Sequence, residues 1–357
     1  MEKKISDIAQ LSTINGRRKQ EHLNIALHED VEFKKVSTGF DDYQFIHQAL
    51  PEIDLDSVDL STNLFGKKLK APLIISGMVG GIEEARRINH NLAQAAQALG
   101  MAMGVGSQRC AIDDATTASS YQVRSVAPDI LLFANLGAIQ LNNGYGIDKC
   151  RRSVDMIEAD ALVLHLNPLQ EALQPGGNTN FSGLLNKIER LCHELPVPVI
   201  AKEVGCGISD EVAGKLASVG VAGVDISGAG GTSWSEVERY RTHTQIGNNI
   251  AAGFASWGIP TAESIRRVQR GAAGLTLIAS GGLRTGLDVA KAIAMGADAA
   301  GVAAPLLKAA NESAGSVIAA LREIIEGLRI SMFCIGASCL MELKNSPLLK
   351  KEKRIKG

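Results

Sequence analysis

Four polar side chains follow a short apolar run in the stretch ALVLHLNPLQE, which spans residues 161–171. The run from Ala161 to Leu164 suits a buried parallel strand, and the chain then breaks into a loop at Pro168. The polar side chains at this break are His165, Asn167, Gln170 and Glu171. Because unpaired polar groups are costly to bury, they indicate either a strand end that faces water or a site that uses them.

Two glycine-rich turns and a lysine extend this pattern to other apolar runs. SGGLRTG (280–286) and AAPLL (303–307) follow the last two runs, and such paired turns, with the helix start at Thr285, would point backbone N–H groups at a phosphate near Arg284. Lys202 ends the run PVIAK, where a buried cation needs a carboxylate or an anionic ligand as partner. A flavin held by its phosphate at these turns would lie over Lys202, and Asn135 and Ser107 would offer hydrogen bonds to its ring.

Eight apolar, β-rich runs alternate with helical stretches from Ala71 onward, which predicts an α/β fold of the (β/α)8 TIM-barrel type. The expected strands span residues 72–76, 101–105, 130–135, 161–165, 198–202, 223–227, 275–280 and 299–304. The clearest expected helices span residues 83–99, 181–194, 209–219, 261–269 and 286–295. A doubly wound open sheet is the alternative. In a barrel, the site lies at the carboxyl ends of the strands, where the polar residues above are found.

The sequence divides into three segments. Residues 1–70 are an N-terminal extension with a basic helical segment at 17–27 and a hairpin around Gly66, residues 71–343 form the barrel, and residues 344–357 form a basic tail that we expect to fray. The connection 228–258 after the sixth strand is long enough to be a functional flap. Trp234 and Trp257 bracket this flap, and we expect both to be packing anchors.

Composition excludes several classes of function. The 357-residue chain has a net charge of −1 and only 4% aromatic residues, so neither a nucleic acid nor an anionic membrane is an expected partner. The six cysteines form no C-x-x-C pair, which is typical of reduced thiols in a cytosolic protein. The N-terminus lacks an apolar signal core and no apolar run is long enough to span a membrane, so we expect a cytoplasmic protein.

Three motifs together resemble one family, the type 2 isopentenyl diphosphate isomerases. They are RKQEH (Arg18–His22), HLNPLQE and GGTSW, and the resemblance runs from Arg18 to about residue 340. It implies an FMN-binding TIM barrel that isomerises isopentenyl diphosphate to dimethylallyl diphosphate. It also implies reduced FMN supplied through NADPH, Mg²⁺ on the diphosphate, and a homotetramer or homo-octamer.

The resemblance assigns roles residue by residue. The implied diphosphate contacts are Arg18, Lys19, His22, Arg109 and His165, with Asn167 and Gln170 beside the substrate and Glu171 as the Mg²⁺-side carboxylate. The implied flavin contacts are Ser76, Gly77, Met78, Val79, Ser107, Asn135, Lys202, Ser227, Thr232, Gly281, Gly282, Arg284, Ala303 and Ala304. Gln170, Glu238 and Lys202 are the implied catalytic residues, and Glu238 lies in the flap.

The identity of the proton carrier stays open at this point. Gln170 is an amide that cannot exchange a proton at neutral pH, so its expected role is positioning. We expect N5 of reduced FMN to act as acid and base, with Glu238 as the competing candidate from the protein. Val79 stands where the family usually has Thr, so any hydrogen bond from that hydroxyl must come from backbone N–H groups instead.

Other flavin barrels are the alternatives. A 2-hydroxy acid oxidase or dehydrogenase needs a His base and carboxylate-binding arginines, and the sixth strand end, SGAGGTSW, has neither. A nucleotide dehydrogenase needs a nucleophilic cysteine, for which Cys206 is the nearest candidate. A flavin-binding protein without enzymatic activity would not require both RKQEH and HLNPLQE.

Overall fold

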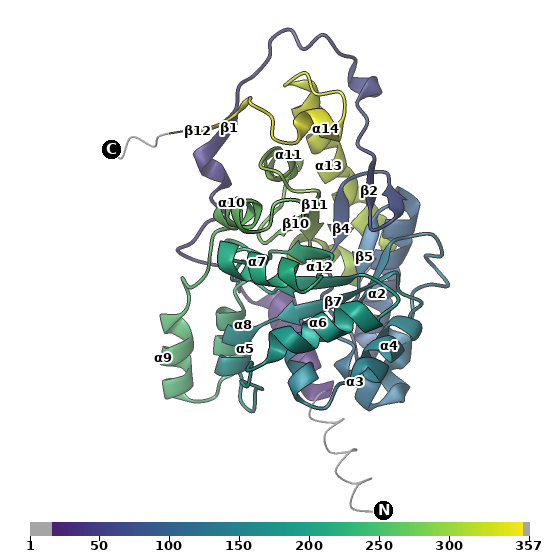
Figure 1. Cartoon of the computed structure of the whole chain (residues 1–357), viewed down its shortest axis with the longest axis vertical. Coiled ribbons are helices and arrows are strands. Elements are labelled where there is room, and N and C mark those ends of the chain that lie inside the picture. The colour runs from purple at the N-terminus through teal and green to yellow at the C-terminus, as the bar shows by residue number, and fades with distance from the viewer. Residues whose placement is uncertain (1–15, 353–357) are drawn as a thin grey trace, which may run out of the picture.

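Eight parallel strands close into a barrel in the computed structural model, which describes residues 16–352 (Figure 1). In chain order they are β4 (Leu73–Ile75), β5 (Ala102–Gly104), β6 (Leu132–Gly137), β7 (Ala161–Leu166), β8 (Val199–Glu203), β9 (Gly223–Asp225), β10 (Thr276–Ser280) and β11 (Ala299–Val302). Neighbours in sequence are neighbours in the sheet, and β11 pairs with β4 to close the ring. The TIM-barrel prediction is therefore confirmed, and each expected strand is present.

Helices surround this ring. They are α2 (Glu83–Leu99), α3 (Arg109–Asp113), α4 (Ile147–Asp155), α5 (Pro168–Leu173), α6 (Leu184–Glu194), α7 (Asp210–Ser218), α8 (Trp234–Arg241), α9 (Gln245–Gly253), α10 (Thr261–Gly271), α11 (Gly286–Ala294), α12 (Ala304–Glu312), α13 (Ala314–Phe333) and α14 (Leu340–Leu343). α2 matches its expected range at both ends. Glu83 and Glu84 favour its positive N-terminus, and Gly100 ends it in the left-handed conformation. None of the helices described is long and apolar enough to cross a membrane.

A hairpin closes the amino-terminal end of the barrel. β2 (Thr62–Leu64) and β3 (Lys67–Leu69) pair across a turn in which Phe65 and Gly66 both have positive φ. Leu64 and Leu69 pack into the apolar core inside the ring, and the Phe65 ring meets Phe133 edge to face at 6.0 Å. The hairpin predicted around Gly66 is confirmed, and it fills the bottom of the barrel.

The N-terminal extension reaches the opposite end of the barrel. Residues 16–28 are helical, and the segment after them joins the flap through backbone hydrogen bonds. Phe33 N donates to Gly231 O at 3.0 Å, and Ser233 N donates to Val31 O at 2.8 Å. The flap is ordered as α8 and α9, which lie at the lower left of Figure 1, far from the hairpin.

The expectation of a frayed tail is wrong for part of it. β12 (Leu349–Lys351) pairs antiparallel with β1 (Tyr43–Phe45), and the ammonium group of Lys351 lies 5.7 Å from the centre of the Tyr43 ring. Without the tail, the edge of β1 would have unpaired backbone groups, and these are the partners of β12. The basic charge of the tail does not reveal such a partner. Residues 1–15 and 353–357 of the expected terminal segments lie outside the described residues.

The hairpin gives a stability prediction. Leu69→Ala removes a side chain that is 2% exposed from the inner core, so we expect a loss of about 2–5 kcal/mol in the free energy of unfolding. Lys68→Ala, on the exposed face of the same strand, should change it by less than about 0.5 kcal/mol. Urea unfolding of both variants measures this, and equal losses would contradict the hairpin's role as a plug.

Candidate active site

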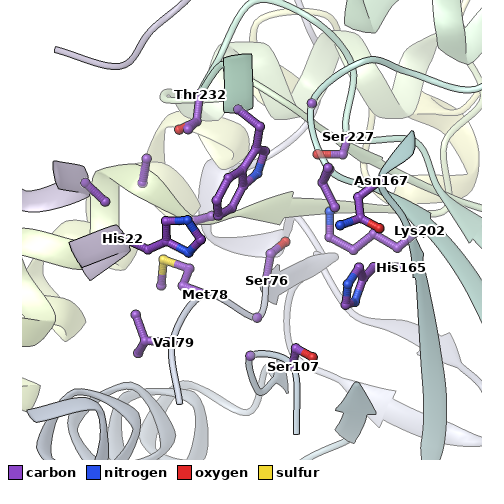
Figure 2. Close-up of a pocket in the computed structure, with 18 of the residues that line it drawn as sticks. His22, Ser76, Met78, Val79, Ser107, His165, Asn167, Lys202, Ser227 and Thr232 are labelled. Carbon is purple, nitrogen blue, oxygen red and sulfur yellow. The ribbon is translucent and has the colours of Figure 1, made fainter. Parts of the chain in front are cut away.

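A pocket of about 270 Å³ opens at the carboxyl ends of the barrel strands (Figure 2). Every residue that the sequence assigns to substrate, flavin or metal lines it, from Arg18 on the N-terminal helix to Ala304 at the start of α12. Glu238 is the predicted site residue that the described lining does not include. The fold therefore brings together residues that lie almost 290 positions apart in the chain.

Positive charge gathers at one side of the mouth. Arg18 and Lys19 come from the N-terminal helix, and Arg109 begins α3. Burial lowers the pKa of Lys19, and the charges of Arg18 and Arg109 lower it further, although Cys110 acts in the opposite direction. Within residues 16–352, the buried Nε of Arg109 makes no hydrogen bond, and Asp113 Oδ2 lies 3.7 Å from it. Such a cluster favours an anion that several donors can contact at once.

His165 is held neutral at the end of β7. Burial, followed by the charges of Lys19 and Lys202, lowers its pKa to about 3. Its Nδ1 lies 2.8 Å from Asn135 Oδ1, and because that oxygen only accepts, Nδ1 carries the proton. Nε2 then has a lone pair, so His165 donates to a diphosphate only if binding of the anion brings a second proton to the ring.

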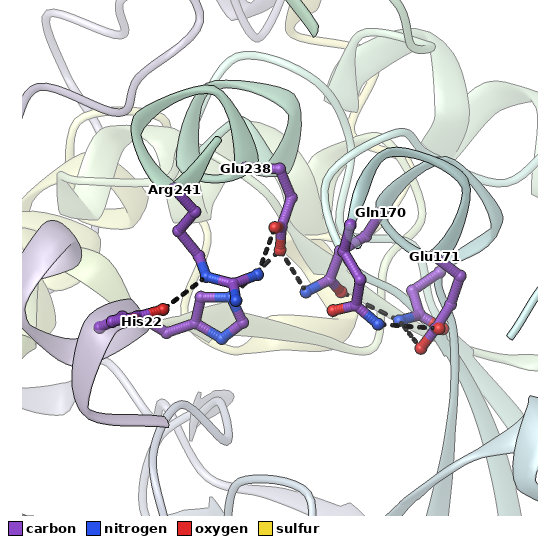
Figure 3. A network of polar contacts seen from close by, with 8 residues as sticks. His22, Gln170, Glu171, Glu238 and Arg241 are labelled. Atoms are coloured by element: carbon purple, nitrogen blue, oxygen red, sulfur yellow. Dashed lines mark hydrogen bonds and ion pairs between the residues drawn. The ribbon is translucent and has the colours of Figure 1, made fainter. Parts of the chain in front are cut away.

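Glu171 lies at the centre of the polar cluster on α5 (Figure 3). Its Oε1 accepts from Asn167 Nδ2 at 3.2 Å, and its Oε2 accepts from Gln174 Nε2 at 2.9 Å and from Asn178 N at 2.6 Å. Asn167 Nδ2 also donates to Gln170 Oε1 at 2.9 Å. Asn167, Gln170 and Glu171 therefore form an interconnected unit rather than a solvated strand end, while His165 bonds to Asn135 instead.

A divalent cation fits beside Glu171 only with help from a ligand. The described residues contain no group of three His, Cys, Asp or Glu side chains placed to hold a metal, and Glu171 is the only acidic residue in the described lining. Asn167 Oδ1 is buried without a hydrogen-bond partner among the described groups. Mg²⁺ accepts such a site, because it takes one or two carboxylates and completes its shell with phosphate oxygens and water.

The floor of the pocket carries Lys202, and its anionic partner is a carboxylate. Lys202 Nζ donates to the Glu203 carbonyl at 2.7 Å and lies 3.6 Å from Asp225 Oδ2. The sequence predicts that this buried lysine has an anionic partner, and the ion pair confirms it. Figure 2 shows Lys202 near His165, Asn167 and Ser227.

The glycine turns on the far side fit a flat, phosphorylated cofactor. Gly281 and Gly282 both have positive φ, and a Cβ on Gly282 would lie 2.5 Å from Gly230 O. α12 begins at Ala304 with no side-chain cap. Pro305 has no N–H and Leu306 N donates to Ala303 O at 2.9 Å, so the amide that this turn can offer to the pocket is that of Ala304. Ser76 Oγ, also in the lining, is a buried hydroxyl without a partner in the part of the chain described. These features satisfy what an FMN phosphate and ring require.

The helix that starts at Thr285 does not contribute as expected. The side chain of Asp288 accepts from the backbone N–H groups of Arg284 and Thr285, and Thr285 caps Asp288 N in return. The Arg284 side chain pairs with Glu32 Oε1 at 2.6 Å. α11 is capped in part by its own side chains, and the described pocket lining includes Arg284 but not Thr285. The amides left to the pocket are therefore those of the glycine turn and of Ala304.

Glu238 lies behind the lining and connects three elements (Figure 3). Its Oε1 accepts from His22 Nε2 at 3.1 Å and from Gln170 Nε2 at 3.4 Å, and its Oε2 accepts from Arg241 Nη1. Burial alone would raise the pKa of Glu238, but the hydrogen bond and charge of His22 and the charge of Arg241 bring it below its usual value. An ionised, enclosed carboxylate of this kind orients its donors.

Sequence reasoning overlooked several residues of the site. Trp234 lines the pocket and its ring meets His22 edge to face at 5.2 Å, while Trp257 is 61% exposed, so the expectation of two packing anchors is wrong for Trp257. The sequence did contain a signal for Asp225, because a charged residue inside an apolar strand indicates a buried partner or a site. Arg241 had none beyond its place in the flap. Val79 lines the pocket with its apolar side chain.

Glu203 shapes the wall next to Lys202. Its Oε2 accepts from the backbone N–H groups of Val204, Gly205 and Cys206, and so folds the loop after β8 around one carboxyl group. Burial raises the pKa of Glu203 to about 7, against the lowering effect of these donors and of Lys202. Burial, followed by the charge of Glu203, raises the pKa of the neighbouring Cys206 thiol to about 12, so this cysteine is not a nucleophile at neutral pH.

Known proteins resemble this chain at two levels. The family model described as FMN-dependent dehydrogenase matches residues 16–127 and 177–350. Proteins named isopentenyl-diphosphate delta-isomerase from Nostoc sp. and Synechocystis sp. are 52% and 53% identical. The alignments cover 97% of this chain and 98% of the Nostoc protein, and 93% of this chain and 95% of the Synechocystis protein.

Solved structures share the fold at low identity. A mandelate oxidase mutant with an FMN adduct superimposes with a TM-score of 0.62 at 19% identity, over 88% of this chain and 90% of that one. A flavocytochrome b2 mutant with pyruvate bound gives 0.65 at 17% identity, over 92% and 82%. These likenesses support the barrel architecture alone.

Glu203 generates a prediction about pH. Because its pKa in the folded protein lies above the usual 4.5, the folded state holds this proton more tightly than the unfolded chain. The corresponding stability is present below about pH 4.5 and is lost as the pH rises through about 7, by on the order of 3 kcal/mol. Glu203→Gln keeps an acceptor but does not titrate. Urea unfolding at several pH values should show wild type losing stability relative to this variant, and parallel curves would contradict the assignment.

Proposed function

The chain belongs to the isopentenyl-diphosphate delta-isomerases within the FMN-dependent dehydrogenase family, and from this premise we propose that it converts isopentenyl diphosphate to dimethylallyl diphosphate with reduced FMN and Mg²⁺. One observation carries the proposal. A cluster of half-buried cations and a glycine cradle line the same pocket, so an anionic substrate and a phosphorylated flavin fit together in one space.

The diphosphate binds at the cationic side in this proposal. Arg18, Lys19 and Arg109 neutralise its charge, and the unpaired Nε of Arg109 gains an acceptor. His22 and His165 complete the set, the latter after proton uptake. Glu171 lies within the same polar cluster and would hold Mg²⁺ against the phosphate oxygens.

The flavin occupies the floor and the glycine cradle. Gly281, Gly282 and the start of α12 would hold the phosphate, and Ser76, Ser107 and Asn135 would meet the ring. Lys202 would offset negative charge at the N1–C2 edge. Ser227, Thr232, Gly77, Met78, Val79, Ala303 and Ala304 complete the proposed contacts.

The isomerisation needs a proton to be added at one carbon and removed from another. When bound, reduced FMN would supply this acid and base group at N5. Glu238 fits this division of labour as a positioning residue, because it is ionised, 2% exposed and bonded to Gln170 and His22. Gln170 in turn would orient the hydrocarbon part of the substrate. The protein's task is to hold the alkene against the ring and to keep water away.

Further expectations rest on the family alone. We propose NADPH as the reductant, a cytoplasmic location, and a homotetramer or homo-octamer. The alternative nucleotide dehydrogenase is disfavoured, because Cys206 has a raised pKa and the described pocket lining does not include it. The 2-hydroxy acid oxidase alternative lacks its catalytic His at the end of β9, where the sequence is SGAGGTSW.

The proposed activity can be tested directly. The purified protein, reconstituted with FMN and reduced with NADPH, is incubated with isopentenyl diphosphate and Mg²⁺ in deuterated water. We expect a bound-flavin spectrum and deuterium in the allylic product, detected by mass spectrometry. A protein that binds no FMN, or a product without deuterium, would overturn the proposal.

The metal assignment makes a separate prediction. Glu171→Gln should strongly raise the Mg²⁺ concentration that the reaction requires while FMN binding persists, because Glu171 supplies the one carboxylate of the described pocket lining. Gln174→Leu, which removes a donor to Glu171 Oε2, should raise the Mg²⁺ concentration needed by about 10–100-fold. Activity titrated against Mg²⁺ measures both effects.

Glu211→Gln is the matched control for the metal prediction. This glutamate pairs with Lys215 on the surface of α7, outside the described pocket lining. The activity of the Glu211→Gln variant, titrated against Mg²⁺, should coincide with that of wild type. If Glu171→Gln also coincided with wild type, Glu171 would not hold the metal.

A further inference from the structure

A buried carboxylate lies beneath the pocket floor without a role in the proposed reaction. Asp225 ends β9 and is 5% exposed, and the described lining of the main pocket does not include it. Its Oδ1 accepts from Ser280 Oγ and from Ser227 N, and its Oδ2 faces Lys202 Nζ at 3.6 Å. A charge buried inside the ring of strands is costly unless it serves as a partner to another charge.

A small cavity lies between this carboxylate and the pocket. It has a volume of about 20 Å³ and its polar lining is Ser76, Asn135, Lys202 and Asp225. That is room for about one water molecule, and the unpaired Ser76 Oγ is a hydroxyl that such a water would satisfy. Ser76 and Lys202 also line the main pocket, so they connect the two spaces.

We propose that Asp225 is a positioning residue that sets how much positive charge Lys202 presents to the flavin. This inference rests on the proposed FMN site and deepens it. Asp225 draws the ammonium group toward the barrel interior, and Ser280 holds the carboxylate through its hydroxyl. Lys202 Nζ also donates a hydrogen bond to the Glu203 carbonyl, which fixes the direction of the side chain.

The sign of the effect follows from electrostatics in an enclosed site. A cation beside the N1–C2 edge favours the electron-rich reduced flavin, and a carboxylate on the other side of that cation opposes it. Removing the carboxylate charge should therefore raise the reduction potential of bound FMN. Removing the hydroxyl that shares the charge of Asp225 should strengthen the carboxylate's field and lower the potential.

A purely structural role for Asp225 makes a different prediction. In that case the ion pair would serve the fold, and its loss would change the unfolding free energy but leave the flavin potential where it was. Asp160 provides the comparison, because this carboxylate pairs with Lys67 and Arg124 where β7 begins, near the hairpin plug. It lies at the end of the barrel opposite the pocket.

The test measures the two-electron potential of bound FMN by spectroelectrochemistry in the full-length protein. For Asp225→Asn we expect a shift toward the reduced form of at least about tenfold in the equilibrium constant, or about +30 mV. Ser280→Ala should shift it in the opposite direction, and Asp160→Asn should leave it unchanged. The dissociation constant of FMN from each apoprotein gives a second readout that needs no turnover.

Each outcome separates the inference from the proposed function. If wild type binds FMN and Asp225→Asn has the wild-type potential, the inference is overturned while the proposed function stands. If Asp225→Asn does not fold, Ser280→Ala decides, and an unchanged or raised potential in that variant overturns the inference. If wild type binds no FMN, the proposed function falls and the inference falls with it.

Discussion

Concentrated positive charge at the pocket mouth is the constraint on which the rest of this structure depends. Burial lowers the pKa of Arg18 and of Lys19, and the charge of Arg109 lowers both further. The barrel itself contributes only part of this cluster. Two of the three cations arrive on the N-terminal helix, so the site exists only when that helix is docked.

Docking of the helix depends on the ionised carboxylate of Glu238. It joins His22 of the N-terminal helix, Arg241 of α8 and Gln170 of α5, and Arg241 also pairs with Glu21 at 3.3 Å. The charge-assisted hydrogen bonds that three donors make to this buried carboxylate are far stronger than a surface ion pair. The flap, the helix and the loop after β7 therefore hold one another in place, and the fold of the site is cooperative.

Much of this arrangement could be predicted from sequence, and the rest fails for identifiable reasons. Strand runs were readable because both faces of a parallel barrel strand are apolar, and α2 was readable from its acidic first turn and Gly100. His165 and Lys202 could be placed in one pocket because strand ends meet at one edge, whereas Arg18, Lys19 and His22 were assigned by the family resemblance. Glu238 was assigned to the site, but its position behind the lining depends on how α8 packs. β12 and the capped start of α11 depend on partners, β1 and Asp288, that local patterns do not identify.

The hairpin plug also sets an order of events. Leu64, Phe65 and Leu69 fill the amino-terminal end of the barrel. A molecule can therefore reach the floor of the pocket only through the pocket mouth beneath the N-terminal helix. A molecule seated beside Lys202 must therefore enter before one held by Arg18 and Lys19, and it must leave after it. Depth in the pocket thus fixes which of the two molecules is able to exchange while the other stays bound.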